Sequence, residues 1–464
     1  PGLTGPRRVP VIVGGRGVRA GRVLGPARDS AEALGTEPVG RLLWQACSQT
    51  TMSVAVYGVY ALTNAWFVSW GVGAVAFAAV NLVAPVVMVL GAVAATVGAG
   101  GASLVSRSLG RGDRARAARA AGNAFLVFWV AAVLVGGLGV LLIDPLVTLL
   151  GATAATRGYA HDYGQVILAG SLAATGFSSL VRAEGRMRYS TMIWVLAVLT
   201  QMVLDPLFIF GLDLGVRGAA LATVCGQSVS SAMGLWFFFG QRDRPYRITA
   251  ADLRPHGPTL RQLVGVGAPS FLSGLGGTLL AVLTNTLLVT AGGPLVLSAF
   301  ALCNRIGTFV LMPQLGIAQG LQPVAGYNAG RGAGVRVRRA ITLTLRATVL
   351  YGLTVCLVLQ LAAGPIVGLF TDEQAVRSAA VGALRVLALA YPCAGVATLV
   401  SAYFQALGRP RPSYLISIGA IVAVKVPLLL GFGSFGVPAL WVAVPVAELV
   451  AAAGALLILR RLGS

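Results

Sequence analysis

A succession of long apolar runs along almost the whole chain constrains its fold more than any other feature. Each run holds about the 20 residues that a helix needs to cross the hydrocarbon core of a bilayer. Hydrophobic residues make up 56% of the 464 residues and charged residues only 11%, whereas about a quarter of a globular protein is charged. The chain is therefore predicted to be an all-α membrane protein. The predicted spans are 42–69, 73–103, 119–143, 159–182, 190–211, 217–240, 261–290, 294–325, 338–363, 379–405, 413–433 and 436–459.

The arginines gather in alternate loops between these runs. Groups follow the second, fourth, sixth, eighth and tenth runs, while the intervening loops hold few basic residues and several acids. Because cytoplasmic loops carry the excess of Lys and Arg, both termini are predicted to be cytoplasmic, in the plasma (inner) membrane of a bacterium. The net charge of +21 then reflects topology, so no nucleic-acid partner is expected.

A repeat with a period of about 220 residues divides the chain. Gly110-Arg111-Gly112 recurs as Gly330-Arg331-Gly332, and Gly215-Val216 recurs as Gly436-Val437. Two homologous six-helix bundles are predicted, with a central cavity between them as the substrate path. The predicted parts are an Arg/Gly/Pro-rich, disordered cytoplasmic tail (1–40), an amino-terminal lobe (41–240), a cytoplasmic linker (241–260) and a carboxy-terminal lobe (261–464).

Few ionisable residues fall inside the predicted spans, and a charge there is costly enough to suggest a function. Asp205 lies near the end of the fifth span, Lys425 in the eleventh and Glu448 in the twelfth. For Asp205 the alternative is a helix-end acid at the outer interface, and for Lys425 and Glu448 it is a structural ion pair. Glu184 is expected at the interface, close to Arg182 and Arg186.

Uncharged polar and aromatic residues supply weaker candidates for a cavity. The amide side chains of Asn and Gln line water-filled paths in some membrane proteins and only form hydrogen bonds with neighbouring helices in others. Trp44, Tyr57, Trp66 and Trp194 are candidates to stack on an organic cation, although anchoring at the membrane interface is the commoner role. The polar candidates within the spans include Gln49, Asn64, Gln201, Asn285, Gln319 and Gln322.

Several motifs of membrane enzymes and pumps are missing from the sequence. It contains neither GxxxxGK[ST] nor HExxH, so nucleotide hydrolysis and metalloprotease chemistry are not expected. The five cysteines are scattered singly without a CxxC pair and are predicted to be packing residues. No catalytic residue, metal site or cofactor is predicted, and the chain is expected to act as a monomer in the lipid bilayer.

The segment from Gly316 to Gly330 contains Gln322-Pro323 followed by Gly326-Tyr327-Asn328. This segment resembles the eighth-helix signature of the bacterial multidrug and toxic compound extrusion (MATE) family. That family lies within the multidrug/oligosaccharidyl-lipid/polysaccharide exporter superfamily. Leu204-Asp205-Pro206-Leu207 is similar to the family's fifth helix. The likeness covers about residues 41 to 460. It implies two six-helix bundles around a central cavity and adds Tyr327 and Asn328 to the cavity candidates.

The resemblance also implies export of organic compounds, cationic or amphipathic, driven by proton or sodium entry. In that family an acid on the first helix and an Asn-x-x-x-Asp on the fifth form the cation site. Asp205 matches the fifth-helix acid, while Gln201 replaces its Asn and Asn64 replaces the first-helix acid. Because sodium prefers several anionic oxygens, proton antiport is favoured over sodium antiport.

Two other functions stay open at this point. The closest alternative is a flippase for lipid-linked oligosaccharides or polysaccharides, for which a more basic cavity and additional helices are expected. A membrane-embedded enzyme or a channel belongs to a different class. The missing catalytic motifs disfavour the enzyme, and the duplicated bundles around one path fit an alternating-access carrier better than a fixed pore.

Overall fold

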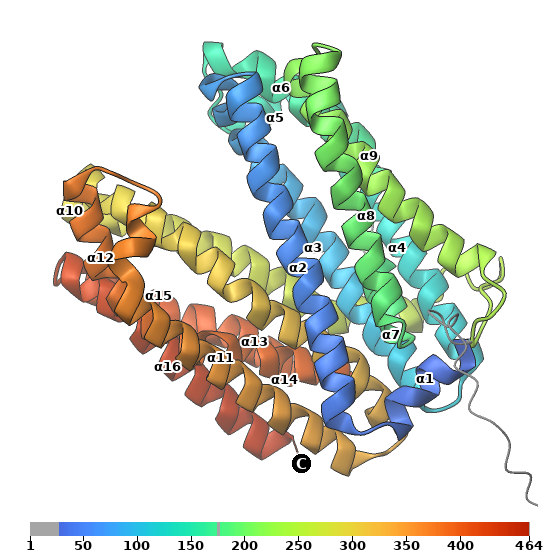
Figure 1. Cartoon of the computed structure of the whole chain (residues 1–464). Helices are drawn as coiled ribbons and strands as arrows, with labels where there is room; N and C mark the ends of the chain where they lie inside the picture. Colours follow the sequence, from blue (N-terminus) through green and yellow to red (C-terminus); the bar gives the residue numbers. More distant parts are fainter. Residues whose placement is uncertain (1–26, 174–176, 464) are drawn as a thin grey trace, which may run out of the picture.

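Two lobes of helices diverge from a common base in the computed structural model, which describes residues 27–173 and 177–463 (Figure 1). The first part of the chain comprises α1 (Ala27–Thr36), α2 (Val39–Gly71), α3 (Ala74–Gly110), α4 (Arg114–Leu141), α5 (Ile143–Leu149), α6 (Ala154–Ala169), η1 (Gly170–Ala173), α7 (Phe177–Ala183), α8 (Met187–Pro206), η2 (Leu207–Gly211), α9 (Gly215–Leu235) and η3 (Trp236–Gly240). The carboxy-terminal lobe comprises α10 (Gly257–Gly330), α11 (Gly334–Gly368), α12 (Gln374–Ala388), α13 (Tyr391–Ala406), α14 (Pro410–Gly419), η4 (Ala420–Lys425), α15 (Val426–Gly433) and α16 (Val437–Leu462).

Several helices end at turns where a glycine has a positive φ angle. After Gly110 the chain turns, and the Asp113 side chain accepts a hydrogen bond from Arg116 N at 2.9 Å, which caps α4. The 74-residue α10 contains two predicted spans, because Gly293 (φ 70°, ψ −165°) reverses the chain within it. Only glycine adopts such a backbone conformation without strain.

The predicted all-α membrane fold is confirmed. Within the described part of the chain, eight helices are long and apolar enough to cross a membrane, or nine when α12 and α13, bent by 50°, count as one span. Helix α10 crosses twice, which adds one span to these nine. The more polar α2 and α9, which line the cavity described below, add two more, so that the helices account for the twelve predicted spans. No strand occurs within residues 27–173 and 177–463.

The internal duplication is visible in the backbone. Gly112 and Gly332, one repeat apart, have φ angles of 76° and 77°. Gly185 and Gly408, a second related pair, have φ angles of 82° and 69°. Equivalent turns therefore adopt equivalent conformations in both halves, which supports the division into two homologous bundles.

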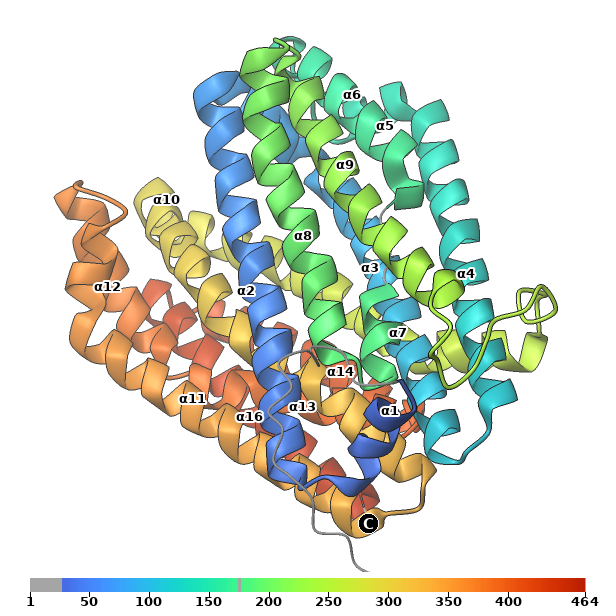
Figure 2. The ribbon, with the colours of Figure 1, turned by 45° about the vertical axis from the view of Figure 1, so that its right-hand side comes forward.

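The two lobes share one hydrophobic core at one end of the molecule and separate towards the other. We call the shared end the basic end, because it carries the arginine-rich loops 111–113, 184–186, 241–256, 331–333 and 407–409. Its core contains residues of both lobes, such as Leu104 and Leu321. Beyond it lie two distinct cores, one around Val83 and Tyr163 and the other around Cys303 and Leu384. The separation gives the molecule its V shape (Figures 1 and 2).

Glycines line the contact between the lobes at the basic end. A Cβ atom at Gly100 would lie 2.0 Å from the carbonyl oxygen of Leu263, and one at Gly330 would lie 2.1 Å from that of Arg107. Thr50 Oγ1 also donates to the carbonyl oxygen of Gly316 at 2.6 Å. We call these contacts the glycine seam. Small residues permit such close helix approach in membrane proteins, and here they close the basic end.

Residues 27–36 of the expected disordered tail form helix α1 instead, while residues 1–26 lie outside the described part of the chain. The helix is held because Asn328 Nδ2 donates to Leu34 O at 2.8 Å and Arg336 donates to Glu37 O at 2.6 Å. Gly185 of the amino-terminal lobe also lies against Ser30. The helix therefore touches both lobes at the basic end.

The linker between the lobes begins after Gly240 and ends at Gly257, close to the predicted 241–260, and it is docked on the amino-terminal lobe. Asn123 Nδ2 donates to the carbonyl oxygens of Asp252 and Arg254 at 3.1 and 3.2 Å. Arg244 forms an ion pair with Glu184, and both side chains are only 1% exposed. Glu184, which the sequence places close to Arg182 and Arg186, is therefore also a buried partner of the linker.

Candidate functional site

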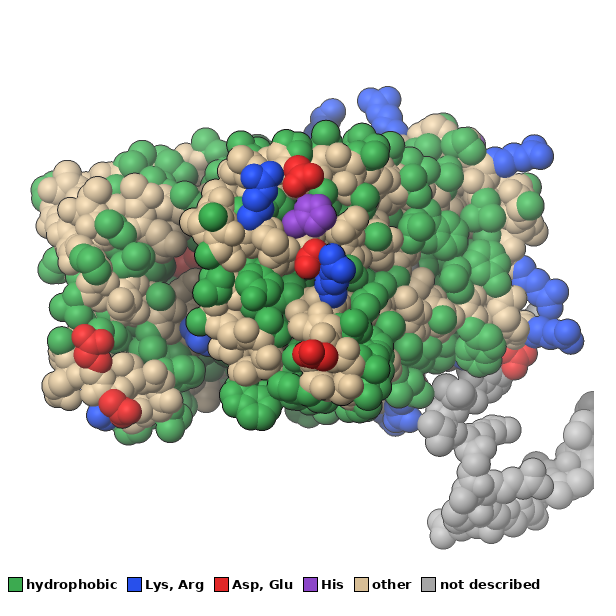
Figure 3. Space-filling model, turned by 90° about the horizontal axis from the view of Figure 1, so that it is seen from above, with side chains coloured by type: hydrophobic (Ala, Val, Ile, Leu, Met, Phe, Trp, Pro, Cys, Tyr) green, Lys and Arg blue, Asp and Glu red, His purple; other side chains and the backbone are tan. Residues whose placement is uncertain are grey.

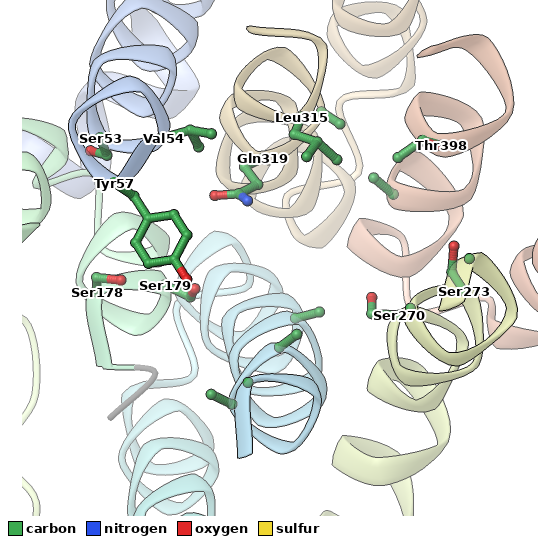
Figure 4. Close-up of a pocket in the computed structure, with 18 of the residues that line it drawn as sticks. Ser53, Val54, Tyr57, Ser178, Ser179, Ser270, Ser273, Leu315, Gln319 and Thr398 are labelled. Carbon is green, nitrogen blue, oxygen red and sulfur yellow. The ribbon is translucent and has the colours of Figure 1, made fainter. Parts of the chain in front are cut away.

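A cavity of about 850 Å³ lies between the two lobes. Figure 4 shows part of its wall, with Tyr57 of α2 and Ser179 of α7 on one side and Ser270 and Thr398 of the carboxy-terminal lobe on the other. Seen from the end opposite the basic end, the molecule is hollowed between the two blocks (Figure 3). A pocket of several hundred cubic ångströms matches the size of sites for small organic molecules.

Asp205 is fully buried where α8 ends at Pro206 and the chain continues as the π-helical turn η2. Proline has no N–H to donate, and π turns often accompany functional sites. Neither carboxylate oxygen of Asp205 has a hydrogen-bond partner within the described residues. An ionised carboxylate without partners is expensive to bury, so this position suits an acid that gains and loses a proton.

A small polar network separates Asp205 from the cavity. Gln201 Nε2 donates to Thr223 Oγ1 at 2.6 Å, and the Tyr60 hydroxyl lies 3.4 Å from the same oxygen. Both Gln201 and Tyr60 line the cavity, as does Tyr163. Asp205 itself does not belong to the lining.

Asn64, which replaces the expected first-helix acid, is 7% exposed, and its Nδ2 has no hydrogen-bond partner in the part of the chain that the structure describes. Because both oxygens of Asp205 are also unpartnered, no direct hydrogen bond joins the two side chains. A contribution of Asn64 to a cation site at Asp205 would therefore require a different conformation or a bridging water.

Lys425 and Glu448 form an ion pair in the carboxy-terminal lobe. Lys425 Nζ lies 2.5 Å from Glu448 Oε1, and both residues line the cavity. Lys425 ends the π-helical turn η4, so the irregular backbone of this lobe leads to the pair. This arrangement is consistent both with a structural ion pair and with a role of the two residues in transport.

The other predicted cavity residues divide into two groups. Gln319 and Gln322 line the cavity, together with the aromatic candidates Tyr57 and Trp194. Asn328 is instead buried at the basic end, where it bonds α1 and Arg336. The remaining candidates that lie outside the lining are Gln49, whose carbonyl oxygen accepts from Thr191, the exposed Asn285, the buried Tyr327, and the exposed Trp44 and Trp66.

Sequence reasoning missed the most unusual lining residue, Arg182. It was counted among the arginines that indicate topology, but its side chain is 6% exposed and faces the cavity. Tyr60, Tyr163 and Thr223 were also missed, because a tyrosine or threonine in an apolar helix carries little signal of its own. The three residues lie on three different helices and come together only when the helices pack.

Comparison with known proteins agrees with this architecture. The family model described as MatE matches residues 50–207 and 269–430, one stretch in each lobe. A protein named FAD transporter from Shewanella oneidensis is 26% identical over 89% of this chain and 92% of its own length. The multidrug export protein MepA of Staphylococcus saprophyticus is 24% identical over 86% of this chain and 89% of its own length.

Solved structures show the same arrangement of helices. A multidrug resistance MATE family transporter in an outward-facing conformation superposes with a TM-score of 0.88, at 27% identity, over 94% of this chain and 98% of that one. A MATE structure in the straight conformation gives the same score and identity, over 93% and 98%. The relatives are transporters and not enzymes, and the chain is a multi-pass membrane protein that belongs to the MATE family.

Proposed function

We propose that this chain is a secondary active exporter that carries amphipathic organic compounds across a bacterial plasma membrane in exchange for protons. Membership of a family of efflux transporters supports the export function. The observation that carries the choice of coupling ion is the buried, unpartnered carboxyl group of Asp205 behind the wall of the cavity.

Proton exchange at Asp205 has a physical basis in the change of its surroundings. Burial without a hydrogen-bond partner favours the neutral acid, while hydration favours the carboxylate. A conformational change that lets water reach Asp205 through Gln201 and Tyr60 would release the proton, and closure would restore the buried state. An equilibrium that depends on protonation in this way couples proton movement to the alternation of the lobes.

A proton is favoured over sodium because of the side chains that surround this position. Sodium is a hard cation that takes several oxygen ligands. Asn64 holds the place of the second acid that the family's pattern expects and brings one neutral oxygen instead. The amphipathic nature of the substrate is supported by the lining, where Tyr57 and Trp194 lie near serines and glutamines.

Transport in everted membrane vesicles tests the proposal. Ethidium and fluorescein serve as cationic and anionic fluorescent substrates, with and without a protonophore. Asp205→Asn is expected to abolish uphill transport and its protonophore sensitivity, while downhill exchange and membrane expression persist. Asp213→Asn, the same change at an exposed loop acid of the same lobe, is the matched control and should behave as the wild type. Uphill, protonophore-sensitive transport by the Asp205→Asn protein would refute the assignment.

A further inference from the structure

Arg182 is a buried cation whose hydrogen-bond partners among the described residues are neutral. Nη2 donates to Ser179 Oγ at 2.9 Å and to Gln319 Oε1 at 3.2 Å, and Nη1 donates to Ser190 Oγ at 3.4 Å. The side chain is 6% exposed and belongs to the cavity wall. A charge in such a place is expensive unless something compensates it.

No acid among the residues whose side chains the structure describes forms an ion pair with Arg182. The nearby Glu184 is occupied by Arg244 through two hydrogen bonds. The guanidinium group therefore faces the cavity without an oppositely charged partner among the described side chains.

The guanidinium group also has donors to spare. Of its five N–H bonds, the three contacts above use two on Nη2 and one on Nη1. Nε and the second hydrogen of Nη1 have no partner within the described residues. A planar donor group of this kind matches the oxygens of a carboxylate or a phosphate.

The other charged residues of the cavity wall do not cancel the positive charge of Arg182. Lys425 and Glu448 line it as an ion pair and neutralise one another. Among the described residues, the lining therefore holds two cations and a single acid. An organic cation bound beside Arg182 would meet repulsion in a site of low dielectric constant. An anion would find the attraction that the protein leaves unused.

Aromatic side chains lie on the same wall. The rings of Tyr57 and Trp194 stand edge to face with their centres 5.8 Å apart, and the indole donates to Ser178 Oγ at 3.1 Å. In Figure 4 the Tyr57 ring points towards Ser179, and Gln319 lies across from it. Both Ser179 and Gln319 are partners of Arg182. A bound molecule with an aromatic body can therefore place an anionic group against Arg182.

We propose that Arg182 recognises an anionic group of the exported substrate, so that this transporter selects soluble aromatic compounds that carry a carboxylate or a phosphate. The inference rests on the proposed export function and narrows its amphipathic substrates to anionic ones. Because Gln319 comes from the other lobe, an anion that takes a hydrogen of Nη2 would replace a hydrogen bond between the lobes. Substrate binding would then also weaken one link across the cavity.

Riboflavin and riboflavin 5′-phosphate test this assignment, because they share one aromatic ring system and differ by the phosphate. Purified protein in nanodiscs is titrated with each, and binding is followed by flavin fluorescence. The wild type is expected to bind the phosphate more tightly. Arg182→Gln should weaken binding of the phosphate by about 10- to 100-fold, the range for a hydrogen bond to a charged group, and change riboflavin binding by less than about threefold.

Two variants keep the test decisive. Arg182→Lys retains a positive charge and should retain most of the preference for the phosphate, which also covers the case in which the Gln variant fails to fold. Arg157→Gln removes an exposed arginine of the same lobe and should leave both affinities unchanged. An equal loss of both ligands in Arg182→Gln, or no preference for riboflavin 5′-phosphate in the wild type, would overturn the inference.

A phosphate carried by a lipid shares the same chemistry, and competition distinguishes the two sources. Undecaprenyl pyrophosphate is added to the nanodiscs, and its displacement of the flavin is measured in wild-type protein and in Arg182→Gln. Tighter, Arg182-dependent binding of the lipid than of the soluble phosphate would overturn the assignment to soluble anions. Since all these measurements are made without a proton gradient, failure of proton coupling at Asp205 would leave their outcome unaffected.

Discussion

The glycine seam at the basic end allows a direct test of how the two lobes alternate. Gly100 of α3 lies against the backbone of Leu263 in α10, where an added Cβ would be 2.0 Å from the carbonyl oxygen. Contacts of a Cβ below 3.0 Å essentially do not occur in proteins. In Gly100→Ala the two helices must therefore move apart by about 1 Å. The closed basic end is expected to lose stability relative to a conformation in which the seam is open.

The size of the effect follows from the cost of overpacking. An extra methyl group in a tightly packed contact costs about 1–3 kcal/mol. A difference of this size changes the ratio of two conformations by about 5- to 150-fold. The neighbouring atom at Gly100 is a backbone oxygen, which a side-chain rotation does not relieve, so the upper part of this range is expected.

Spin labels at Arg114 and Val335, exposed residues at the basic ends of the two lobes, report the separation in a cysteine-free background. Double electron–electron resonance should show mainly the short distance in the parent protein and an added long-distance population in Gly100→Ala. Gly91→Ala is the control, because Gly91 lies on the same helix with open space around its would-be Cβ. A distance distribution in Gly100→Ala that matches the parent would refute the argument that the seam limits lobe approach.

Three other contacts are open to equally direct tests. Arg244→Ala should lower the unfolding free energy by about 3–5 kcal/mol, because it leaves the buried Glu184 without its partner; the melting temperature in detergent measures this, and an unchanged value would count against a structural role of the pair. Asn328→Ala should speed hydrogen exchange in residues 27–36, since the variant loses the bond to Leu34 O, whereas Asn81→Ala, which bonds only its own helix, should not; equal exchange in both variants would contradict the anchoring of α1. Cysteines introduced at Thr153 and Gln374 should react with an impermeant reagent from outside the cell, and a tag at residue 250 should be reached only from inside; the opposite pattern would overturn the topology drawn from the arginines.

Local turn chemistry explains why so much of the helical architecture was predictable. The break at Gly292-Gly293-Pro294 is a true chain reversal, because glycine supplies the positive φ that the turn requires. The repeat pairs such as Gly112 and Gly332 likewise adopt matching conformations. Partners that lie far away in the chain were not predictable. Glu184 was expected close to Arg182 and Arg186, and only the structure shows that it pairs with Arg244, sixty residues later.

By itself the sequence determined the membrane environment, the helix boundaries, the duplication and the family resemblance, because apolar length, turn residues and repeats are properties of consecutive residues. It also singled out Asp205, since an acid in an apolar run is visible without a structure. Only the tertiary structure decided that Gln319 and Gln322 face a cavity while Asn328 anchors α1. It alone showed Arg182 as a buried cation between lobes, because unpaired charge is a property of the surrounding helices and not of the chain that carries it.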